Sequence, residues 1–203
     1  MLADGVQEAL ISTSVRPPIS GPLNLLWLGR LVPSKRPDIA LRVLGRLVQM
    51  GVPVHLKVVG AGPMAAKLER IARDLDLGDA YESVGRVPWA ETRALHQGAD
   101  LLLFHSMRDS SCPSVLEAAS QGMPTVGLRV QGFGSAIPET LAFGPTKLVN
   151  SRTLVEELAD ECAALYYDAQ RYAAASTAAL AFARTQTWNE KLNRILSTVG
   201  KPR

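Results

Sequence analysis

From residue 23 onward, the chain alternates short apolar runs with longer segments whose apolar positions recur at helical spacing. This alternation predicts strands followed by helices, which is typical of a parallel sheet covered by helices on both faces. The runs lack a strict apolar–polar alternation, as expected for strands buried on both faces. The predicted strands cover residues 23–28, 54–59, 81–84, 101–104, 125–128 and 147–149.

Helical patterns fill the gaps between these runs. The clearest begins at Pro37 and ends before Gly51, which matches the usual placement of proline and glycine at helix ends. After about residue 150 the strand signals stop, and Ala- and Leu-rich patterns predict a tail of three helices. The predicted helices cover residues 37–49, 64–75, 89–97, 114–120, 153–165, 170–184 and 188–198.

These elements predict an α/β fold, a Rossmann-like doubly wound parallel sheet of about six strands followed by C-terminal helices. The expected strand order is 3-2-1-4-5-6. Residues 1–22 contain two proline-rich turns and are predicted to be a linker. The domain would then span residues 23–203, with its helical tail at about 151–203.

Composition excludes several classes of function. A hydrophobic fraction of 47% and a charged fraction of 20% are those of an ordinary globular domain. The net charge of +3 comes from 22 basic and 19 acidic residues, and no long basic run forms a stripe for duplex binding. With only 5% aromatic residues, a base-stacking platform is not expected either. The small positive excess fits a small anionic ligand or has no functional meaning.

The residues with metal-binding or redox chemistry are few and scattered. Cys112 and Cys162 lie in different segments without C-x-x-C spacing, so neither a disulfide framework nor a zinc knuckle is predicted. His55 and His96 are far apart in sequence, so no metal site is expected. No apolar run approaches the ~18 to 20 residues of a membrane span, and the N-terminus lacks the order of a signal peptide. A reducing, cytoplasmic location is therefore expected.

Two loops beyond the carboxyl ends of predicted strands carry the candidate chemistry. In the expected strand order, the first and fourth strands are neighbours, and a ligand crevice opens between their ends. The first loop contains Arg30 and Lys35. A guanidinium grips a phosphate through two hydrogen bonds and an ammonium adds a point charge, so the pair suits a diphosphate, including one that leaves during a reaction. Considered alone, the loop would be better interpreted as a solvated basic turn.

The second loop contains Asp109 and leads into the helix that includes Glu117. The amides of Ser114, Val115 and Leu116 would point at the same phosphates, because a helix N-terminus attracts anions. Glu117 has two interpretations: partner of Ser114 in a capping box, or acceptor for the paired hydroxyls of a ribose. Asp109 is either a turn former or a ligand residue.

Taken in order, these segments resemble the donor-binding half of GT-B glycosyltransferases of family GT4. The likeness covers about residues 23–200. Near the ends, Asp4-Gly5-Val6 looks like the segment that closes the first domain in that family, and Trp188 looks like the tryptophan that opens its last helix. The motifs that carry the resemblance are Gly29-Arg30, Lys35, Val59 to Pro63, Gly85 to Pro88, Asp109 to Ala118, and Gly122 to Pro124.

The resemblance implies a two-domain hexosyltransferase-like enzyme that needs no metal. It would transfer a sugar from a UDP-, GDP- or ADP-sugar to a glycan or lipid-linked acceptor, with retention of configuration. The acceptor-binding half is not contained in this sequence, so we expect weak or absent activity of the chain alone. The resemblance also implies a partner N-terminal domain and peripheral association with a membrane through the full-length protein.

The resemblance also implies roles for single residues. Arg30 and Lys35 would hold the diphosphate and Glu117 the ribose. Asp109 would lie near the donor sugar, where the family usually has a glutamate that is one methylene longer. The remaining assignments are Val87 and Pro88 beside the base, Gly132 near the sugar, and the helix start at Ser114, Val115 and Leu116 beside the phosphates.

Other functions remain open. The run from Gly60 through Gly62 to Ala65 matches G-x-G-x-x-A, and Glu82 follows at a distance that suits a dinucleotide site, so an NAD-dependent oxidoreductase is one alternative. Against it, the motif follows the second strand, and Pro63 removes an amide. A non-catalytic nucleotide-binding or scaffold domain is a second alternative. An epimerase or phosphorylase on the same fold is a third.

Overall fold

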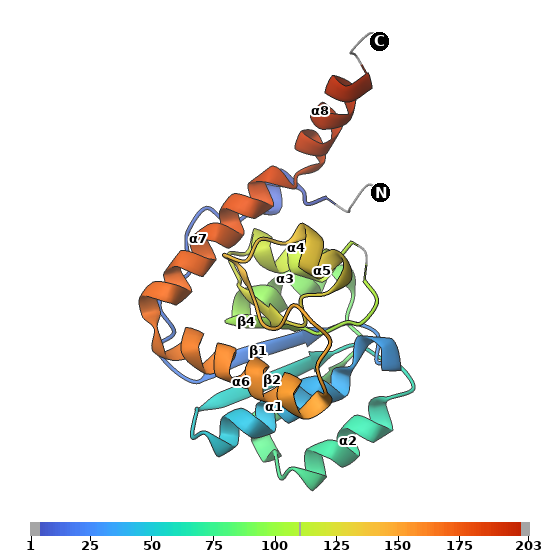
Figure 1. Ribbon diagram of the computed structural model, residues 1–203, viewed down its shortest axis with the longest axis vertical. Coiled ribbons are helices and arrows are strands. Elements are labelled where there is room, and N and C mark those ends of the chain that lie inside the picture. The colour runs from blue at the N-terminus through green and yellow to red at the C-terminus, as the bar shows by residue number, and fades with distance from the viewer. Residues whose placement is uncertain (1–4, 110, 200–203) are drawn as a thin grey trace.

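The computed structural model describes residues 5–109 and 111–199 (Figure 1). Its centre is a parallel sheet in the order β3-β2-β1-β4-β5-β6, which confirms the predicted Rossmann-like topology. The order in which strands are added to the sheet reverses between β1 and β4, and sheets of this kind bind ligands at that point. The strands are β1 (Leu23–Leu28), β2 (Val54–Val59), β3 (Tyr81–Gly85), β4 (Leu101–Phe104), β5 (Thr125–Gly127) and β6 (Ala142–Phe143).

Helices cover both faces of the sheet (Figure 1). One layer consists of α1 (Pro37–Gln49), α2 (Ala65–Asp74) and α6 (Ser151–Tyr167). The other consists of α3 (Trp89–Gly98), α4 (Pro113–Ser120) and α5 (Gln131–Ala136). α7 (Ala169–Thr185) contacts both α6 and α4, and α8 (Trp188–Val199) extends away from the body. Short 3-10 turns are η1 (Glu8–Leu10), η2 (Pro33–Lys35) and η3 (Gly78–Ala80).

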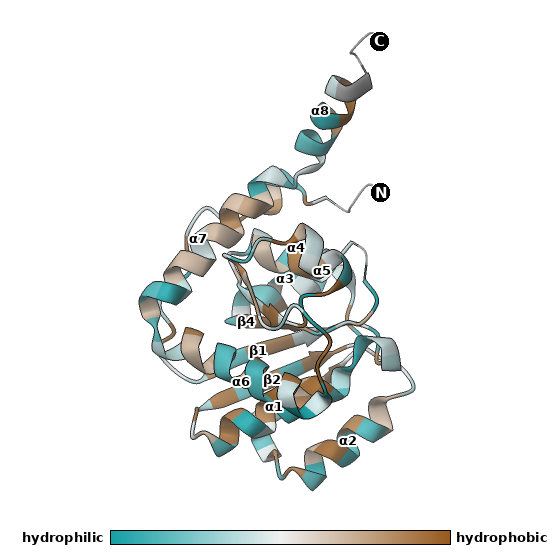
Figure 2. Cartoon of the chain, viewed as in Figure 1, coloured by the Kyte–Doolittle hydropathy of each residue, from teal (hydrophilic) through white to brown (hydrophobic). Residues whose placement is uncertain are grey.

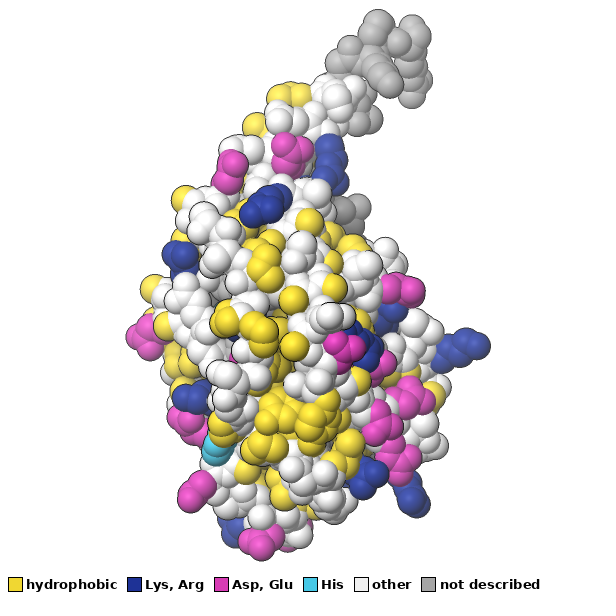
Figure 3. Space-filling model, turned by 90° about the vertical axis from the view of Figure 1, so that its left-hand side faces the viewer, with side chains coloured by type: hydrophobic (Ala, Val, Ile, Leu, Met, Phe, Trp, Pro, Cys, Tyr) yellow, Lys and Arg dark blue, Asp and Glu magenta, His cyan; other side chains and the backbone are white. Residues whose placement is uncertain are grey.

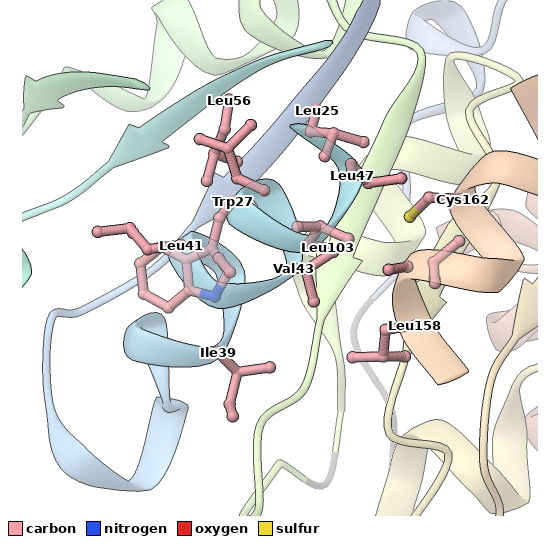
Figure 4. Close-up of a cluster of buried hydrophobic side chains, with 14 of the residues drawn as sticks. Leu25, Trp27, Ile39, Leu41, Val43, Leu47, Leu56, Leu103, Leu158 and Cys162 are labelled. Carbon is pink, nitrogen blue, oxygen red and sulfur yellow. The ribbon is translucent and has the colours of Figure 1, made fainter. Parts of the chain in front are cut away.

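The core consists of two apolar clusters on opposite faces of the sheet. Successive strand residues point to opposite sides, so Leu25 and Trp27 face α1 while Leu26 faces α4. Figure 4 shows the first cluster, in which Val43 and Leu47 of α1 lie against these strand side chains. The hydropathy colouring of Figure 2 shows the same arrangement, with apolar strands and polar outer helix faces.

The surface carries charges of both signs. Figure 3 shows the side on which α6 meets α7: apolar side chains gather in the middle of this face, and basic and acidic ones are interspersed around them. Such mixing does not produce the single-sign field of a duplex-binding surface.

One predicted strand was wrong and one helix was not predicted. Residues 147–149 form no strand; the sixth strand is β6, in which Phe143 pairs with Val126, whereas Leu148 is exposed. Residues 131–136 were assigned no predicted element, yet they form α5. Phe133 of α5 is fully buried with its ring centroid 5.1 Å from that of Phe104, and this tertiary contact outweighs the low helix propensity of glycine.

The predicted linker is fastened to the domain. Val6 forms a parallel bridge with Thr187, and the Arg16 guanidinium donates to the carbonyl oxygens of His96, Ala99 and Gln121. Residues 5–22 therefore lie along the domain as a strap with little regular structure. Asp4 of the predicted domain-closing segment lies outside the described residues.

The glycine motif at residues 60–62 holds two loops together. A Cβ on Gly60 would lie 1.8 Å from the carbonyl oxygen of Gly29, and one on Gly62 would lie 2.5 Å from that of Leu31. Backbone bonds join the same loops, from Gly29 N to the Val59 oxygen and from Leu31 N to the Ala61 oxygen, both at 3.0 Å. This geometry favours tight packing as the reason for these glycines, rather than a dinucleotide fingerprint.

Two histidines are buried in the two-layer core. His105 follows β4 and is fully buried, and both of its ring nitrogens lack a hydrogen-bond partner among the described residues. Burial lowers the pKa of His105 to about 4, opposed by the Asp38 carboxylate and assisted by the Arg36 guanidinium. Burial also lowers the pKa of His96. Both imidazoles are therefore neutral at pH 7.

We predict that Gly60→Ala lowers the free energy of unfolding by about 2 to 4 kcal/mol, because the added methyl overlaps a backbone oxygen that cannot move aside. Urea unfolding measures the change. Gly98→Ala is the control: no atom lies within 4 Å of its Cβ position, so the change should stay within about 1 kcal/mol. Equal effects in the two variants would contradict the packing account.

We also predict that the free energy of unfolding decreases as the pH is lowered from 6.5, the usual histidine pKa, to about 4, the pKa of folded His105. In this window the unfolded chain binds a proton that folded His105 does not, so up to about 3 kcal/mol is lost as the pH falls. His105→Gln should flatten the dependence of the unfolding free energy on pH, and the dependence that is left should come from His96, whose pKa is also lowered. The exposed His55, changed to Gln, should leave it as in the parent chain. A parent-like slope in His105→Gln would refute this prediction.

Candidate functional site

A crevice opens between the carboxyl ends of β1 and β4, where the strand order predicted it. A cavity of about 280 Å³ is lined by the predicted side chains Arg30, Lys35, Asp109, Ser114 and Glu117. An adjoining cavity of about 480 Å³ shares Arg30 and extends past Gly60 to Arg86 and Val87. The residues that the sequence placed in two separate loops therefore lie in the walls of one elongated crevice.

Asp109 connects three segments at this edge of the sheet. Its Oδ2 forms an ion pair with Nζ of Lys35 from the β1–α1 loop. Its Oδ1 accepts the Cys112 amide at 3.0 Å, and its carbonyl oxygen accepts the Gly132 amide at 3.1 Å. Met107 N also donates to the Ser34 carbonyl oxygen at 3.0 Å, so the two predicted loops are bonded directly to each other.

Both loops end in the same conformation. Arg36 has φ 51° and ψ 49°, and Cys112 has φ 50° and ψ 51°; Pro37 and Pro113 then open α1 and α4. A proline disfavours the right-handed helical region for the residue before it, and the left-handed region costs a non-glycine residue about 1–2 kcal/mol. The Asp109 carboxylate helps to hold the second of these turns. This strain is located where the crevice is formed.

The Cys112 thiol is not a nucleophile. Burial, and secondarily the neighbouring Asp109, raises its pKa to about 12. The thiolate that would attack a substrate is therefore not populated at neutral pH.

The capping-box interpretation of Glu117 is wrong. α4 begins at Pro113 and its cap is Cys112, so Ser114 lies inside the first turn and caps nothing. Glu117 instead accepts a hydrogen bond from the Trp89 indole, with Nε1 and Oε1 3.0 Å apart. Its carboxylate is half-buried and lines the crevice. The ribose-acceptor role of Glu117 stays a prediction.

The other predicted residues divide into two groups. Val87 lines the adjoining cavity, whereas the described residues in the walls of the two cavities do not include Pro88, Val115, Leu116 or Gly132. The amides of Val115 and Leu116 donate to the Cys112 carbonyl oxygen at 3.0 and 3.2 Å, so they are already used within the first turn of α4. Pro88 is exposed at the start of α3.

Sequence reasoning missed several residues of the crevice. Trp89 is 64% exposed and lies in the wall beside Thr92. His105 and Ser106 form part of the same wall. The sequence did contain a signal for Trp89, because it follows Pro88 at a strand-to-helix connection on the same edge of the sheet.

A third cavity, of about 480 Å³, lies at the opposite end of β1, between the strap and the residues Asn24, Asp100 and Tyr172. The Arg16 side chain in its wall is committed to three backbone carbonyls. Because the carboxyl ends of the strands are the ligand-binding edge of this fold, the crevice is the better candidate site.

The described part of the chain shows neither a metal cluster nor a membrane span. Among the described residues, no group of three or more His, Cys, Asp and Glu side chains is placed to hold a metal ion. Within residues 5–109 and 111–199, every helix falls short of the length and apolar character needed to cross a bilayer.

Comparison with known proteins shows what this chain is similar to. The family model for glycosyl transferases group 1 matches residues 15–181. A phosphatidylinositol N-acetylglucosaminyltransferase from Arabidopsis thaliana is 28% identical over 70% of this chain and 32% of its own length. A GDP-mannose-dependent alpha-(1-6)-phosphatidylinositol monomannoside mannosyltransferase of Mycolicibacterium smegmatis is 31% identical over 76% of this chain and 41% of its own length. The chain thus spans about a third to two fifths of the length of these relatives.

Solved structures share the fold. The lipopolysaccharide outer core galactosyltransferase WaaB superposes with a TM-score of 0.75 at 19% identity, over 98% of this chain and 54% of that one. HepE of Anabaena in complex with UDP gives a TM-score of 0.75 at 19% identity, over 88% of this chain and 49% of that one. Because the family model covers most of the chain and the fold matches these structures, the chain belongs to the glycosyl transferases group 1 family, the GT4 glycosyltransferases of the GT-B fold.

Proposed function

We propose that this chain is the donor-binding half of a retaining glycosyltransferase and that it holds a nucleotide diphosphate sugar in the crevice between β1 and β4. The observation that carries the proposal is the convergence on one cavity of Arg30, Lys35 and Asp109 from two loops and of Glu117 from α4. Two cations suit a diphosphate, and a carboxylate suits the hydroxyls of a ribose. The partner would be the acceptor-binding domain of a longer protein.

The two cations would have different roles. Arg30 is exposed and forms no ion pair in the part of the chain that the structure describes, so its guanidinium is available for a phosphate. Lys35 is paired with Asp109. An ammonium has three donors, so Lys35 can keep this partner and still reach a phosphate oxygen. Asp109 would then act by aiming Lys35 and by holding Gly132 close to the donor sugar.

In this scheme, negative charge develops on the leaving diphosphate, beside Arg30 and Lys35. The bond between the sugar C1 and the diphosphate oxygen breaks, and the electron pair stays on the phosphate. Arg30 and Lys35 neutralise this developing charge. The acceptor oxygen forms the new bond to C1 on the same face, and its proton passes to the leaving phosphate. No step in this scheme requires a metal ion or a protein nucleophile.

The names of the relatives support a lipid-linked acceptor. The Arabidopsis and Mycolicibacterium proteins are both named as transferases acting on phosphatidylinositol or its mannoside. A cytoplasmic protein that works at a membrane surface is consistent with this, the contact being made through the longer protein. For the base, one relative is named as GDP-mannose-dependent and one structural neighbour holds UDP, so both nucleotides belong in the test.

The test is calorimetric titration of the chain with UDP, GDP, ADP and NAD at one salt concentration. We predict selective binding of one nucleoside diphosphate. Arg30→Ala should weaken it by more than about 1 kcal/mol, because a charge-assisted contact is lost. Arg70→Ala, at an exposed position on α2, is the matched control and should bind as the parent chain does. A preference for NAD, or an Arg30→Ala variant of unchanged affinity, would contradict the proposed site.

A further inference from the structure

Trp89 combines a largely exposed indole ring with a hydrogen bond to a residue of the crevice. It opens α3 directly after the Val87-Pro88 segment, and 64% of its surface is exposed. Its Nε1 donates to Oε1 of Glu117 at 3.0 Å. An indole has one hydrogen-bond donor and no acceptor. The hydrogen bond to the Glu117 carboxylate therefore uses the only donor of the ring.

The hydrogen bond orients Glu117 without saturating it. Among the described residues, the Trp89 indole is the hydrogen-bond partner found for the Glu117 side chain, and it occupies one of the two carboxylate oxygens. The other oxygen keeps its acceptor sites for a ligand. A glutamate otherwise rotates among several rotamers, and a fixed orientation reduces the entropy lost when a ligand binds.

Trp89 also forms a boundary of the crevice. The crevice cavity of about 280 Å³ is lined in part by Trp89, Thr92 and Glu117. The same three residues also line a further cavity of about 300 Å³, together with Leu10 and His96. The indole and the carboxylate therefore form a partition between two hollows.

We propose that Trp89 is a positioning residue for ribose recognition: its indole N–H fixes the Glu117 carboxylate so that the free oxygen accepts the hydroxyls of the nucleotide ribose. This inference rests on the proposed donor site. It assigns selectivity for a ribonucleotide over a 2′-deoxyribonucleotide to the pair of Trp89 and Glu117, and not to Glu117 alone.

Calorimetry tests the pair with UDP, GDP and their 2′-deoxy counterparts, using whichever base the parent chain binds. We expect the parent chain to prefer the ribonucleoside diphosphate by about tenfold, as for a hydrogen bond to a charged acceptor. Trp89→Phe keeps an aromatic ring but removes the N–H, and it should lose most of this preference. Glu117→Gln should also lose it. Binding of the 2′-deoxy ligand should change little in either variant.

The controls separate the failures. Trp188→Phe alters another exposed tryptophan, on α8, and should keep the parent preference. Unfolding curves establish that Trp89→Phe is folded. A parent-like preference for the ribonucleoside diphosphate in Trp89→Phe would overturn the inference. Tighter binding of the ribonucleoside diphosphate by this variant would also overturn it, because the indole would then compete with the ribose for Glu117. Absence of any preference in the parent chain overturns this inference alone, whereas absence of diphosphate binding overturns the proposed function as well.

Discussion

The candidate site depends on one residue, Asp109, which connects three segments through its carboxylate and its main-chain carbonyl oxygen. Asp109 holds Lys35 from the loop after β1, the Cys112 amide at the start of α4, and the Gly132 amide at the start of α5. These segments follow three neighbouring strands, so their loops lie at one edge of the sheet but are not otherwise forced into register. The charge that would help to hold a diphosphate is therefore placed by the same residue that fixes the shape of the crevice.

Much of this fold is predictable from local pattern. The first five strands and the order of the sheet follow from apolar runs separated by helical repeats, because burial on both faces leaves a strong signal. β6 and α5 are not predictable in this way. Phe143 and Phe133 are single aromatic residues in short segments, and their structure comes from contacts with Val126 and Phe104, which are distant in sequence.

The site was predictable in its parts but not in its contacts. Arg30, Lys35, Asp109 and Glu117 follow from the rule that loops beyond the carboxyl ends of strands bind ligands. Whether Glu117 capped α4 depended on the left-handed turn one residue before Pro113, which moves the helix start and leaves the carboxylate facing the cavity. No local sequence rule states that an indole from α3 would meet it.

The most direct test of the central claim is an amide-resolved NMR titration of the chain with UDP and GDP. The account predicts that the largest shifts occur in the loop of residues 29–35 and around Cys112 to Glu117, with smaller ones at Val87. Shifts confined to the strap around Arg16, or to the amides near Glu82, would place the ligand elsewhere and contradict the assignment of the crevice between β1 and β4.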